Sequence, residues 1–360
     1  MKEKMLGKRI AAGIAAIMTA ATLCSCDDLD EYDDYSEEDT SEQTVTSRSE
    51  EVTEALSDRS SESFNGRGSK LNLDSNGGVS ITRLARDNST PMGDADTWTV
   101  FVYMCGSDLE SENGLAVDDI EEMANAYTGD NVRFVVQTGG STRWNGYDIS
   151  ADSLQRFEVT GGGVYLVDEV SDADMGQEQT LEDFLRWGVQ NYPADKMGVV
   201  FWNHGGGSIT GVCFDEKNEY DSLSLTDLDK AFTSVFDEMT DKFEFVGFDA
   251  CLMATVETAN VLVPHARYMI ASEETEPGRG WDYTEIGRYL DENLGCTGAQ
   301  VGKVAADSFY DSCAASDEEA GATLSVTDLS KIDKLIIAIN NAAASMNGAS
   351  DDSSNLSGMV

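Results

Sequence analysis

The sequence predicts an α/β fold built on an open, mostly parallel β-sheet with helices on both faces. Two observations support this prediction. Short apolar runs rich in β-branched and aromatic residues recur between residues 98 and 326, which is typical of strands in a sheet. Segments with helical spacing of apolar residues lie between most of these runs, and strands that alternate with helices favour a parallel sheet covered on both sides.

Six runs are predicted as strands of this sheet: residues 98–104, 132–137, 197–202, 243–248, 268–271 and 323–326. Residues 155–159 and 164–167, joined by glycines, predict a β-hairpin inserted into the alternation. The segments with helical spacing include residues 113–126, 181–189, 225–239, 252–262 and 331–344. A run rich in Gly, Ser, Asp and Asn follows without a closing element, so a C-terminally truncated fragment is one expectation.

The charge of the chain restricts its partners. Its 360 residues are 41% hydrophobic, enough for one sizeable core. The formal net charge is -43, from 67 acidic against 24 basic residues. So acidic a surface excludes nucleic-acid binding through phosphate neutralisation. It suits a cationic partner, a cation, or solubility alone.

Residues 1–26 have the composition of an export signal. Four basic residues precede an apolar run of 14 residues at 10–23, too short to span a bilayer comfortably. The run ends in Leu23-Cys24-Ser25-Cys26, which resembles a bacterial lipobox. We therefore expect Cys26 to be acylated, and the protein to be exported and lipid-anchored to the outer face of a bacterial membrane. An ordinary cleaved signal and secretion are the alternative.

An acidic segment follows the signal. Residues 27–62 contain fifteen acids and two bases, with almost no large apolar side chains. Such a stretch cannot bury enough surface to offset the entropy lost on ordering. The sequence therefore predicts a disordered tether over residues 27–96 and a folded domain over residues 97–360.

Two predicted strands end in residues able to carry chemistry. The strand at 197–202 runs into Asn203 and His204, and the strand at 243–248 runs into Asp249, Ala250 and Cys251. Sites in open α/β sheets lie outside the carboxyl ends of the strands. A cysteine where a strand gives way to a helix is placed for a lowered thiol pKa.

Cys251 is therefore the candidate nucleophile, and His204 is its candidate acid–base partner. The N–H groups of Gly205 and Cys251 are candidate donors to an oxyanion, because the glycines after His204 let the backbone approach a carbonyl closely. The alternatives are a buried, inert cysteine and a hydrogen-bonded turn histidine.

Other polar residues have weaker signals. Asp249 lies two residues before Cys251, on the same side of an extended strand. It is placed either to pair with a substrate Arg or Lys or to cap a helix N-terminus. Trp281 is a candidate lining residue of a substrate subsite. Four acids offer oxygen ligands for Ca²⁺, although they fit no EF-hand spacing and a solvated acidic face is the better explanation for them: Asp108, Glu110, Asp118 and Asp119.

The two strand-end motifs, Asn203-His204-Gly205-Gly206-Gly207 and Phe248-Asp249-Ala250-Cys251-Leu252-Met253, resemble the catalytic motifs of clostripain-type peptidases. Ser272-Glu273-Glu274, with Pro277 and Gly280-Trp281-Asp282-Tyr283, resembles a third block of that family. The resemblance covers the chain from about residue 98 to its end.

This resemblance implies a caspase-like fold and a Cys-His dyad formed by Cys251 and His204, which lie 47 residues apart. It implies cleavage of peptides or proteins after Arg or Lys, with Asp249 in the pocket for the basic side chain. It also implies self-processing between His204 and Cys251, for which Lys217 is the best candidate and Lys230 and Lys242 are alternatives. The chemistry needs no cofactor, although some members depend on calcium.

Two other functions fit parts of the sequence. His204 and the three glycines after it also match the oxyanion motif of lipases and esterases, but the sequence lacks the Gly-x-Ser-x-Gly elbow of that fold. No two His or Cys residues have the spacing of a zinc site. A non-catalytic surface lipoprotein that keeps the fold and binds peptides or glycans is the remaining alternative.

Overall fold

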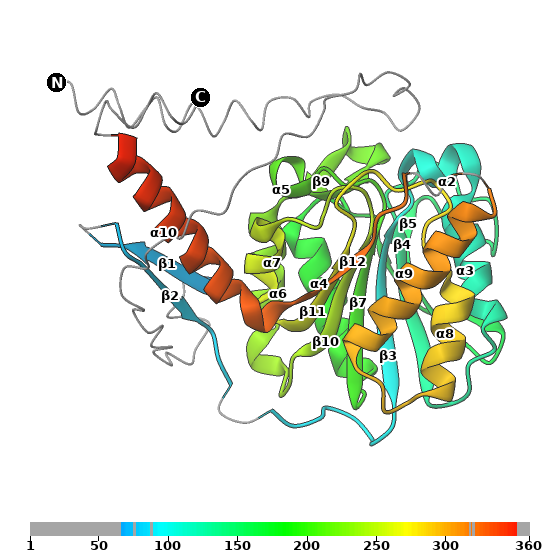
Figure 1. The fold of residues 1–360 in the computed structure, drawn as a ribbon. Helices are drawn as coiled ribbons and strands as arrows, with labels where there is room; N and C mark the ends of the chain where they lie inside the picture. The colour runs from blue at the N-terminus through cyan, green and yellow to red at the C-terminus, as the bar shows by residue number, and fades with distance from the viewer. Residues whose placement is uncertain (1–65, 75–76, 87–88, 317, 319–320, 351–360) are drawn as a thin grey trace. The chain divides into compact units, whose positions relative to one another are not determined.

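The computed structural model describes residues 66–350 apart from 75–76, 87–88, 317 and 319–320 (Figure 1). All of these described residues belong to one compact unit. In chain order the described elements are β1 (Ser69–Leu73), β2 (Val79–Arg83), β3 (Trp98–Cys105), α2 (Ser107–Asn113), α3 (Leu115–Asn125), β4 (Val132–Gly139), β5 (Ser153–Thr160), β6 (Gly163–Ser171), α4 (Glu178–Asn191), β7 (Lys196–Trp202), α5 (Gly207–Thr210), β8 (Val212–Asp215), η2 (Glu216–Asn218), β9 (Asp221–Leu223), α6 (Leu225–Ser234), η3 (Phe236–Glu238), β10 (Phe243–Asp249), α7 (Val256–Leu262), β11 (Ala266–Ala271), α8 (Tyr283–Glu292), α9 (Gly298–Ala314), β12 (Ser325–Asp328), η5 (Leu329–Lys331) and α10 (Ile332–Ser350).

The fold is built on one large sheet. Within the described residues it has eight strands, in the order β12-β11-β10-β7-β3-β4-β5-β6. The five neighbouring strands from β11 to β4 run parallel, and β5, β6 and β12 pair antiparallel towards the two edges. The predicted mostly parallel sheet is confirmed, and the predicted hairpin is β5 and β6.

Burial explains why the central strands are apolar along their whole length. All eight residues of β3 are buried, as are nearly all residues of β7 and β10. Strands buried on both faces have no side that favours polar residues, so their sequences do not alternate.

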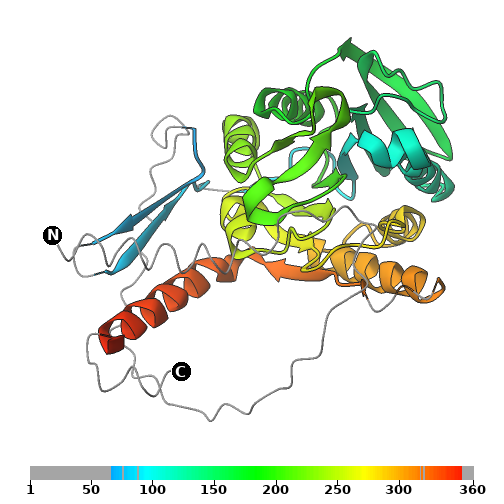
Figure 2. The ribbon, with the colours of Figure 1, turned by 90° about the horizontal axis from the view of Figure 1, so that it is seen from above.

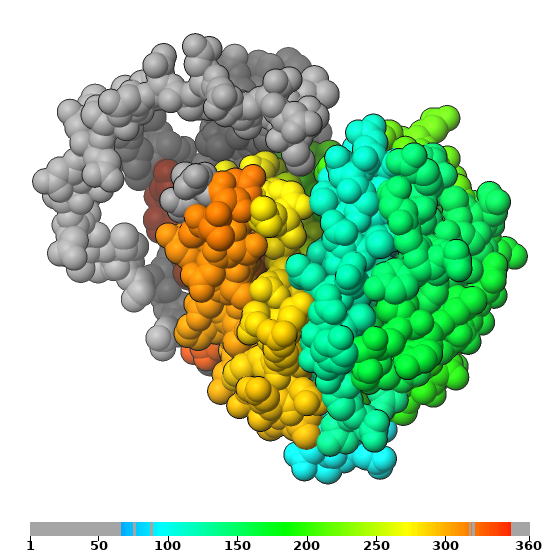
Figure 3. Space-filling view, turned by 90° about the vertical axis from the view of Figure 1, so that its right-hand side faces the viewer, coloured from blue at the N-terminus to red at the C-terminus, as the bar shows by residue number. Residues whose placement is uncertain are grey.

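Helices cover the two faces of the sheet as separate layers. Helices α4, α6 and α7 pack on one face, and α3, α8 and α9 pack on the other (Figures 1 and 2). On the second face, α9, α8 and α3 run side by side (Figure 3).

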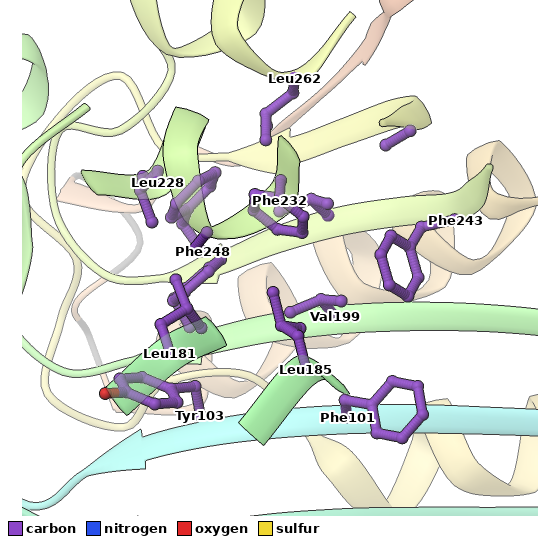
Figure 4. Packing of buried hydrophobic residues seen from close by; sticks show 14 of the residues in the cluster. Phe101, Tyr103, Leu181, Leu185, Val199, Leu228, Phe232, Phe243, Phe248 and Leu262 are labelled. Atoms are coloured by element: carbon purple, nitrogen blue, oxygen red, sulfur yellow. The ribbon is translucent and has the colours of Figure 1, made fainter. Parts of the chain in front are cut away.

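Aromatic side chains fill the layer between the sheet and helices α4 and α6. In Figure 4, Phe232 of α6 lies among the sheet residues Val199, Phe243 and Phe248. The Phe232 and Phe243 rings meet edge to face, with centroids 5.9 Å apart. Such contacts exclude water from the sheet and hold its strand ends in a defined arrangement.

The helix predicted at residues 113–126 is α3, which begins two residues later than predicted, just after Gly114. A separate short helix, α2, ends just before this glycine. Gly114 has φ 77°, a left-handed conformation that terminates a helix and that glycine adopts without steric cost.

The predicted tether is wrong in its C-terminal part. Residues 69–73 and 79–83 pair as the antiparallel strands β1 and β2. The guanidinium of Arg83 fixes this hairpin: it pairs with Asp333 at 2.6 Å and donates to the Asn260 carbonyl and side-chain oxygens. One buried cation with several acceptors compensates for the low hydrophobicity of the segment. Residues 1–65, including the signal, Cys26 and most of the tether, lie outside the described residues.

The segment after β2 is also anchored to the folded unit. Arg86 donates to the backbone oxygens of Phe236 and Met239, and its guanidinium lies 3.8 Å from the centre of the Phe236 ring. Within the described part of the chain, no helix is both long enough and apolar enough to cross a membrane.

Candidate active site

Three neighbouring strands deliver the candidate residues to one edge of the sheet. β7 lies between β3 and β10, and in these pairings Trp202 is aligned with Met104 on one side and Asp249 on the other. The chain then leaves β7 through His204 and β10 through Cys251. Because the three strands are parallel, their carboxyl ends open at the same edge, where ligand sites of such sheets form. The predicted proximity of the two strand ends is confirmed.

The loop after His204 is pressed against the backbone of Cys251. A Cβ atom added at Gly205 would overlap the carbonyl oxygen of Cys251, and one at Gly207 would lie 3.0 Å from the carbonyl oxygen of Leu252. Only glycine allows this approach. The peptides of Gly205 and Cys251, the two predicted oxyanion donors, are therefore close neighbours.

The setting of Cys251 differs from the expected helix N-terminus. The apolar spacing predicts a helix that starts at residue 252, but α7 begins at Val256, with Thr255 as its N-cap. The dipole of α7 therefore does not start at Cys251. Instead, the thiol, which belongs to a residue only 8% exposed, accepts a hydrogen bond from the backbone N–H of Glu276, 3.2 Å from Sγ. A backbone donor aimed at sulfur favours the thiolate.

His204 has an acidic partner. Its Nε2 atom lies 2.9 Å from Oδ1 of Asp108, which follows β3. The bond to His204 is the main cause that lowers the pKa of Asp108 to about 2. Asp108 therefore carries a full negative charge at any pH near neutrality.

Asp249 belongs to a cluster of buried and half-buried acids beside the Cys251 loop. It accepts hydrogen bonds from the Tyr283 hydroxyl at 2.9 Å and from the Trp281 backbone N–H at 3.3 Å. The N-cap alternative for Asp249 is wrong, because Thr255 caps the following helix. We use the name acidic cluster for the carboxyl groups of Asp119, Glu122, Asp249 and Glu276.

Burial raises the pKa of every member of the acidic cluster. The pKa of Asp249 is raised to about 6 and that of Glu122 to about 7. Burial, followed by the charge of Asp249, raises the pKa of Asp119 and of Glu276 well above their usual values. Both carboxyl oxygens of Glu276 are buried, and neither has a partner in hydrogen-bonding geometry among the described residues. No lysine or arginine of that part of the chain is among the leading charges that act on the cluster.

Trp281 is a core residue, and its side chain is not exposed as the predicted lining residue of a substrate subsite would be. Its side chain is 2% exposed and packs against Gly247, where an added Cβ would contact the indole. Its backbone holds Asp249, as described above. Trp281 therefore contacts the acidic cluster from the interior of the protein.

Lys217 lies in the turn η2, between β8 and β9. Its backbone N–H donates to the Asp215 carboxylate at 2.8 Å, and its ammonium group pairs with Asp172 at 2.6 Å. Glu219 and Tyr220, just after this turn, have φ of 57° and 58°. Two consecutive left-handed residues other than glycine mark a strained backbone.

The acids considered as Ca²⁺ ligands do not converge on one site, because they bind different partners. Asp108 contacts His204, Asp119 accepts a bond from the Trp202 indole, and Glu110 accepts backbone N–H groups of nearby loops. Over the residues that the structure describes, no group of three or more His, Cys, Asp or Glu side chains is arranged to hold a metal ion.

Sequence reasoning missed two contacts of the site. It considered Asp108 only as a calcium ligand and did not assign Glu276 any role. The signal for Asp108 was its position just past a predicted strand, but the order of strands in the sheet was needed to place it beside His204. For Glu276 the sequence has no comparable signal, because its contact with Cys251 is made by the backbone.

Comparisons with known proteins agree with this architecture. Clostripain of Hathewaya histolytica is 28% identical over 221 residues, which cover 51% of this chain and 40% of clostripain. The chain thus spans well under half the length of that relative. A secreted C11 cysteine protease of Bacteroides thetaiotaomicron has a similar structure, with a TM-score of 0.54 and 22% identity over 68% of this chain and 69% of that chain.

An inactive zymogen C11 protease of Parabacteroides distasonis matches with a TM-score of 0.50 and 18% identity, over 68% of this chain and 64% of that chain. At these identities the likeness concerns the fold, and it confirms the caspase-like sheet that the sequence resemblance implied. The sequence profile of the clostripain family matches residues 102–359, which is most of the chain. This chain therefore belongs to the clostripain family.

Proposed function

We propose that this chain is a cysteine endopeptidase that cleaves peptide bonds after Arg or Lys, with Cys251 as nucleophile and His204 as proton carrier. The observation that carries the proposal is the meeting of three features at one sheet edge. These are the end of β7 at His204, the thiol that accepts the Glu276 N–H, and the acidic cluster beside it. Membership of the clostripain family supports the same chemistry.

The reaction follows from these groups. The Cys251 thiolate attacks the scissile carbonyl carbon, a C–S bond forms, and the π electron pair moves to the carbonyl oxygen. The Gly205 and Cys251 N–H groups donate to that oxyanion. His204 gives its proton to the leaving amine as the C–N bond breaks. It then takes a proton from water, which attacks the thioester and releases the thiolate.

The acidic cluster supports a preference for basic side chains. Its four carboxyl groups lie close together, and no lysine or arginine is among the leading charges that act on them. A substrate guanidinium or ammonium group would supply the missing charge, and a carboxylate binds a guanidinium in a bidentate way. We assign Asp249 as the main partner, because it stands two residues from the nucleophile.

The proposal includes self-processing at Lys217. The residue is basic, lies between His204 and Cys251 and precedes the strained residues Glu219 and Tyr220. Lys217→Ala should leave one intact chain on a denaturing gel, whereas Lys230→Ala, in the middle of α6, should be processed normally. Two fragments from the Lys217→Ala variant would place the processing site elsewhere.

We also propose that the protein is exported and held on a membrane through acylated Cys26. The basic, apolar and Leu-Cys-Ser-Cys segments of residues 1–26 support this. Replacement of Cys26 by Ser should release the protein from membranes, and unchanged retention would contradict lipidation.

Covalent labelling tests the catalytic proposal against a non-catalytic binding role. A peptide acyloxymethyl ketone with a terminal Lys or Arg should label the wild-type protein, and the label should be lost in Cys251→Ala and His204→Ala. Cys213→Ala is the matched control, because Cys213 is fully buried and lies between the two motifs. Labelling is run with and without added calcium. An unlabelled wild-type protein under both conditions would favour the binding role.

A further inference from the structure

We propose that Asp108 is a positioning residue of the reaction, which holds the His204 imidazole by its Nε2 atom and so directs Nδ1 towards Cys251. This inference rests on the proposed function. It concerns a residue that neither strand-end motif contains, because Asp108 lies 96 positions before His204 in the chain.

The strand order places the three residues in a row. β3, β7 and β10 are adjacent and parallel, with β7 in the middle. Their carboxyl ends lead to Asp108, His204 and Cys251, respectively. The strands after β3, from β4 to β6, lie on one side of it, and the chain then crosses to the other side to form β7. The boundary between β3 and β7 is therefore a topological switch point, where sites of such sheets concentrate.

The contact between Asp108 and His204 selects one form of the imidazole. Asp108 has no proton to donate, because its pKa lies at about 2. The Nε2–H group of His204 therefore donates to the carboxylate across 2.9 Å. Nδ1 then becomes the nitrogen that exchanges a proton with the thiol and the leaving amine.

The backbone around Asp108 is constrained. Ser107 is fully buried and has φ 51°, an uncommon conformation for serine. Its hydroxyl donates to the Asp108 carboxylate at 2.9 Å, and its carbonyl accepts the Ser141 hydroxyl at 2.9 Å. Strained residues that the surroundings hold in place cluster at functional sites.

The charge of Asp108 also favours a charged imidazole. Besides His204, the charge of Asp108 acts on Cys105 and on Tyr220, and the acids Glu216 and Glu112 also act on Tyr220. Burial and then other nearby charges raise the pKa of Cys105, and burial followed by the charge of Asp108 raises that of Tyr220, so neither supplies a second negative charge near neutral pH. The carboxylate of Asp108 is therefore the charge that stabilises the imidazolium required by the thiolate–imidazolium pair.

Kinetics of Asp108→Asn test this role, with the peptide substrate cleaved by the wild-type protein. We expect kcat to fall by about 10- to 100-fold, which is part of the full contribution of an acid–base group. The KM for the substrate should not change, because Asp108 does not contact the acidic cluster. The alkaline limb of the kcat/KM profile should move to lower pH, since the imidazolium loses its negative partner. Asp108→Glu should recover part of kcat.

The matched control is Glu112→Gln, which removes one negative charge from an exposed position of the same helix, α2. It should leave kcat and the pH profile unchanged. Wild-type kcat in Asp108→Asn, or a fall without movement of the alkaline limb, would overturn the inference. These results differ from failure of the proposed function, in which the wild-type protein itself neither cleaves the peptide nor takes the label.

Discussion

The backbone N–H of Glu276 lies 3.2 Å from Sγ of Cys251, and the carboxyl group of the same residue is buried next to Asp249. A single loop residue therefore contacts both the candidate nucleophile and the acidic cluster. The thiol has a donor that does not depend on a helix, and the cluster lies directly beside it. Side-chain substitutions in the acidic cluster should for this reason affect substrate binding and leave the backbone hydrogen bond to the Cys251 thiol in place.

Replacement of Asp249 by Asn should weaken cleavage after basic residues. The variant loses the carboxylate two residues before Cys251 but keeps an oxygen able to accept from the Tyr283 hydroxyl. We expect kcat/KM for an Arg peptide to fall by about 10- to 100-fold, the value of a charge-assisted hydrogen bond. Asp118→Asn is the control, because it removes an exposed acid from α3. Equal activity of the two variants would exclude Asp249 from substrate binding.

Substrate affinity should depend on pH through Asp249, whose pKa is raised to about 6. Only the ionised carboxylate attracts a guanidinium, so KM for an Arg peptide should rise as the pH falls through about 6. Burial is the cause that raises the pKa of Asp249, and its hydrogen bonds with the Tyr283 hydroxyl, the Trp281 N–H and the Glu276 carboxyl oppose the shift. Measurement of KM from pH 5 to pH 8 tests this. A KM that stays constant over this range, or the same rise in Asp249→Asn, would contradict the assignment.

The same pKa predicts how stability changes with pH. Folded Asp249 binds a proton that the unfolded chain releases, since its pKa rises from 3.8 to about 6. The free energy of unfolding should therefore decrease as the pH rises between these values, by up to about 3 kcal/mol from this group. Urea denaturation of the wild-type protein and Asp249→Asn at several pH values measures the contribution. The two curves should converge near pH 4, and a constant difference between them would contradict the shift.

Gly205→Ala should abolish activity while the protein stays folded. The added Cβ would overlap the Cys251 carbonyl oxygen, so the nucleophile loop and the histidine loop are forced apart. A steric insertion of this kind costs about 1–3 kcal/mol, less than the stability of a typical domain. Gly295→Ala is the matched control, because a Cβ there meets nothing within 4 Å. Thermal unfolding and peptide cleavage of both variants separate the effects, and full activity in Gly205→Ala would refute the close approach.

Arg83→Ala should detach the N-terminal hairpin. The variant loses the ion pair with Asp333 and the bonds to Asn260, at a cost of about 2 kcal/mol. Limited proteolysis should then cut residues 66–97 before the rest of the domain. The exposed pair of Arg288 with Glu285 offers the control, since Arg288→Ala should have little effect. Equal protease resistance of wild-type protein and Arg83→Ala would show that the hairpin is held by other contacts.

Local patterns predicted most of the strands and both strand-end motifs. Apolar runs located β3, β4, β7 and β10 to within a few residues, because a strand buried on both faces needs apolar side chains along its length. The parallel order then followed from the helices between the strands. His204 and Cys251 were identified in the same way, since each comes directly after such a strand.

Local composition was misleading where long-range contacts stabilise a segment. Residues 69–83 look too polar to fold, yet Arg83 binds groups that are 177 and 250 positions away. The start of α7 was placed too early because apolar spacing continues through Cys251 and Leu252, whereas the backbone there turns to meet the loop at Glu276.

By itself, the sequence determined which side chains are available for chemistry and that two of them follow strands. It could do so because a buried strand leaves a local run of apolar residues in the sequence. Only the tertiary structure decided their neighbours. Asp108 meets His204, and Glu276 meets Cys251, because the sheet places β3, β7 and β10 side by side and a distant loop folds back over them. Such contacts depend on strand order and on backbone donors, neither of which has a local signature in the amino-acid sequence.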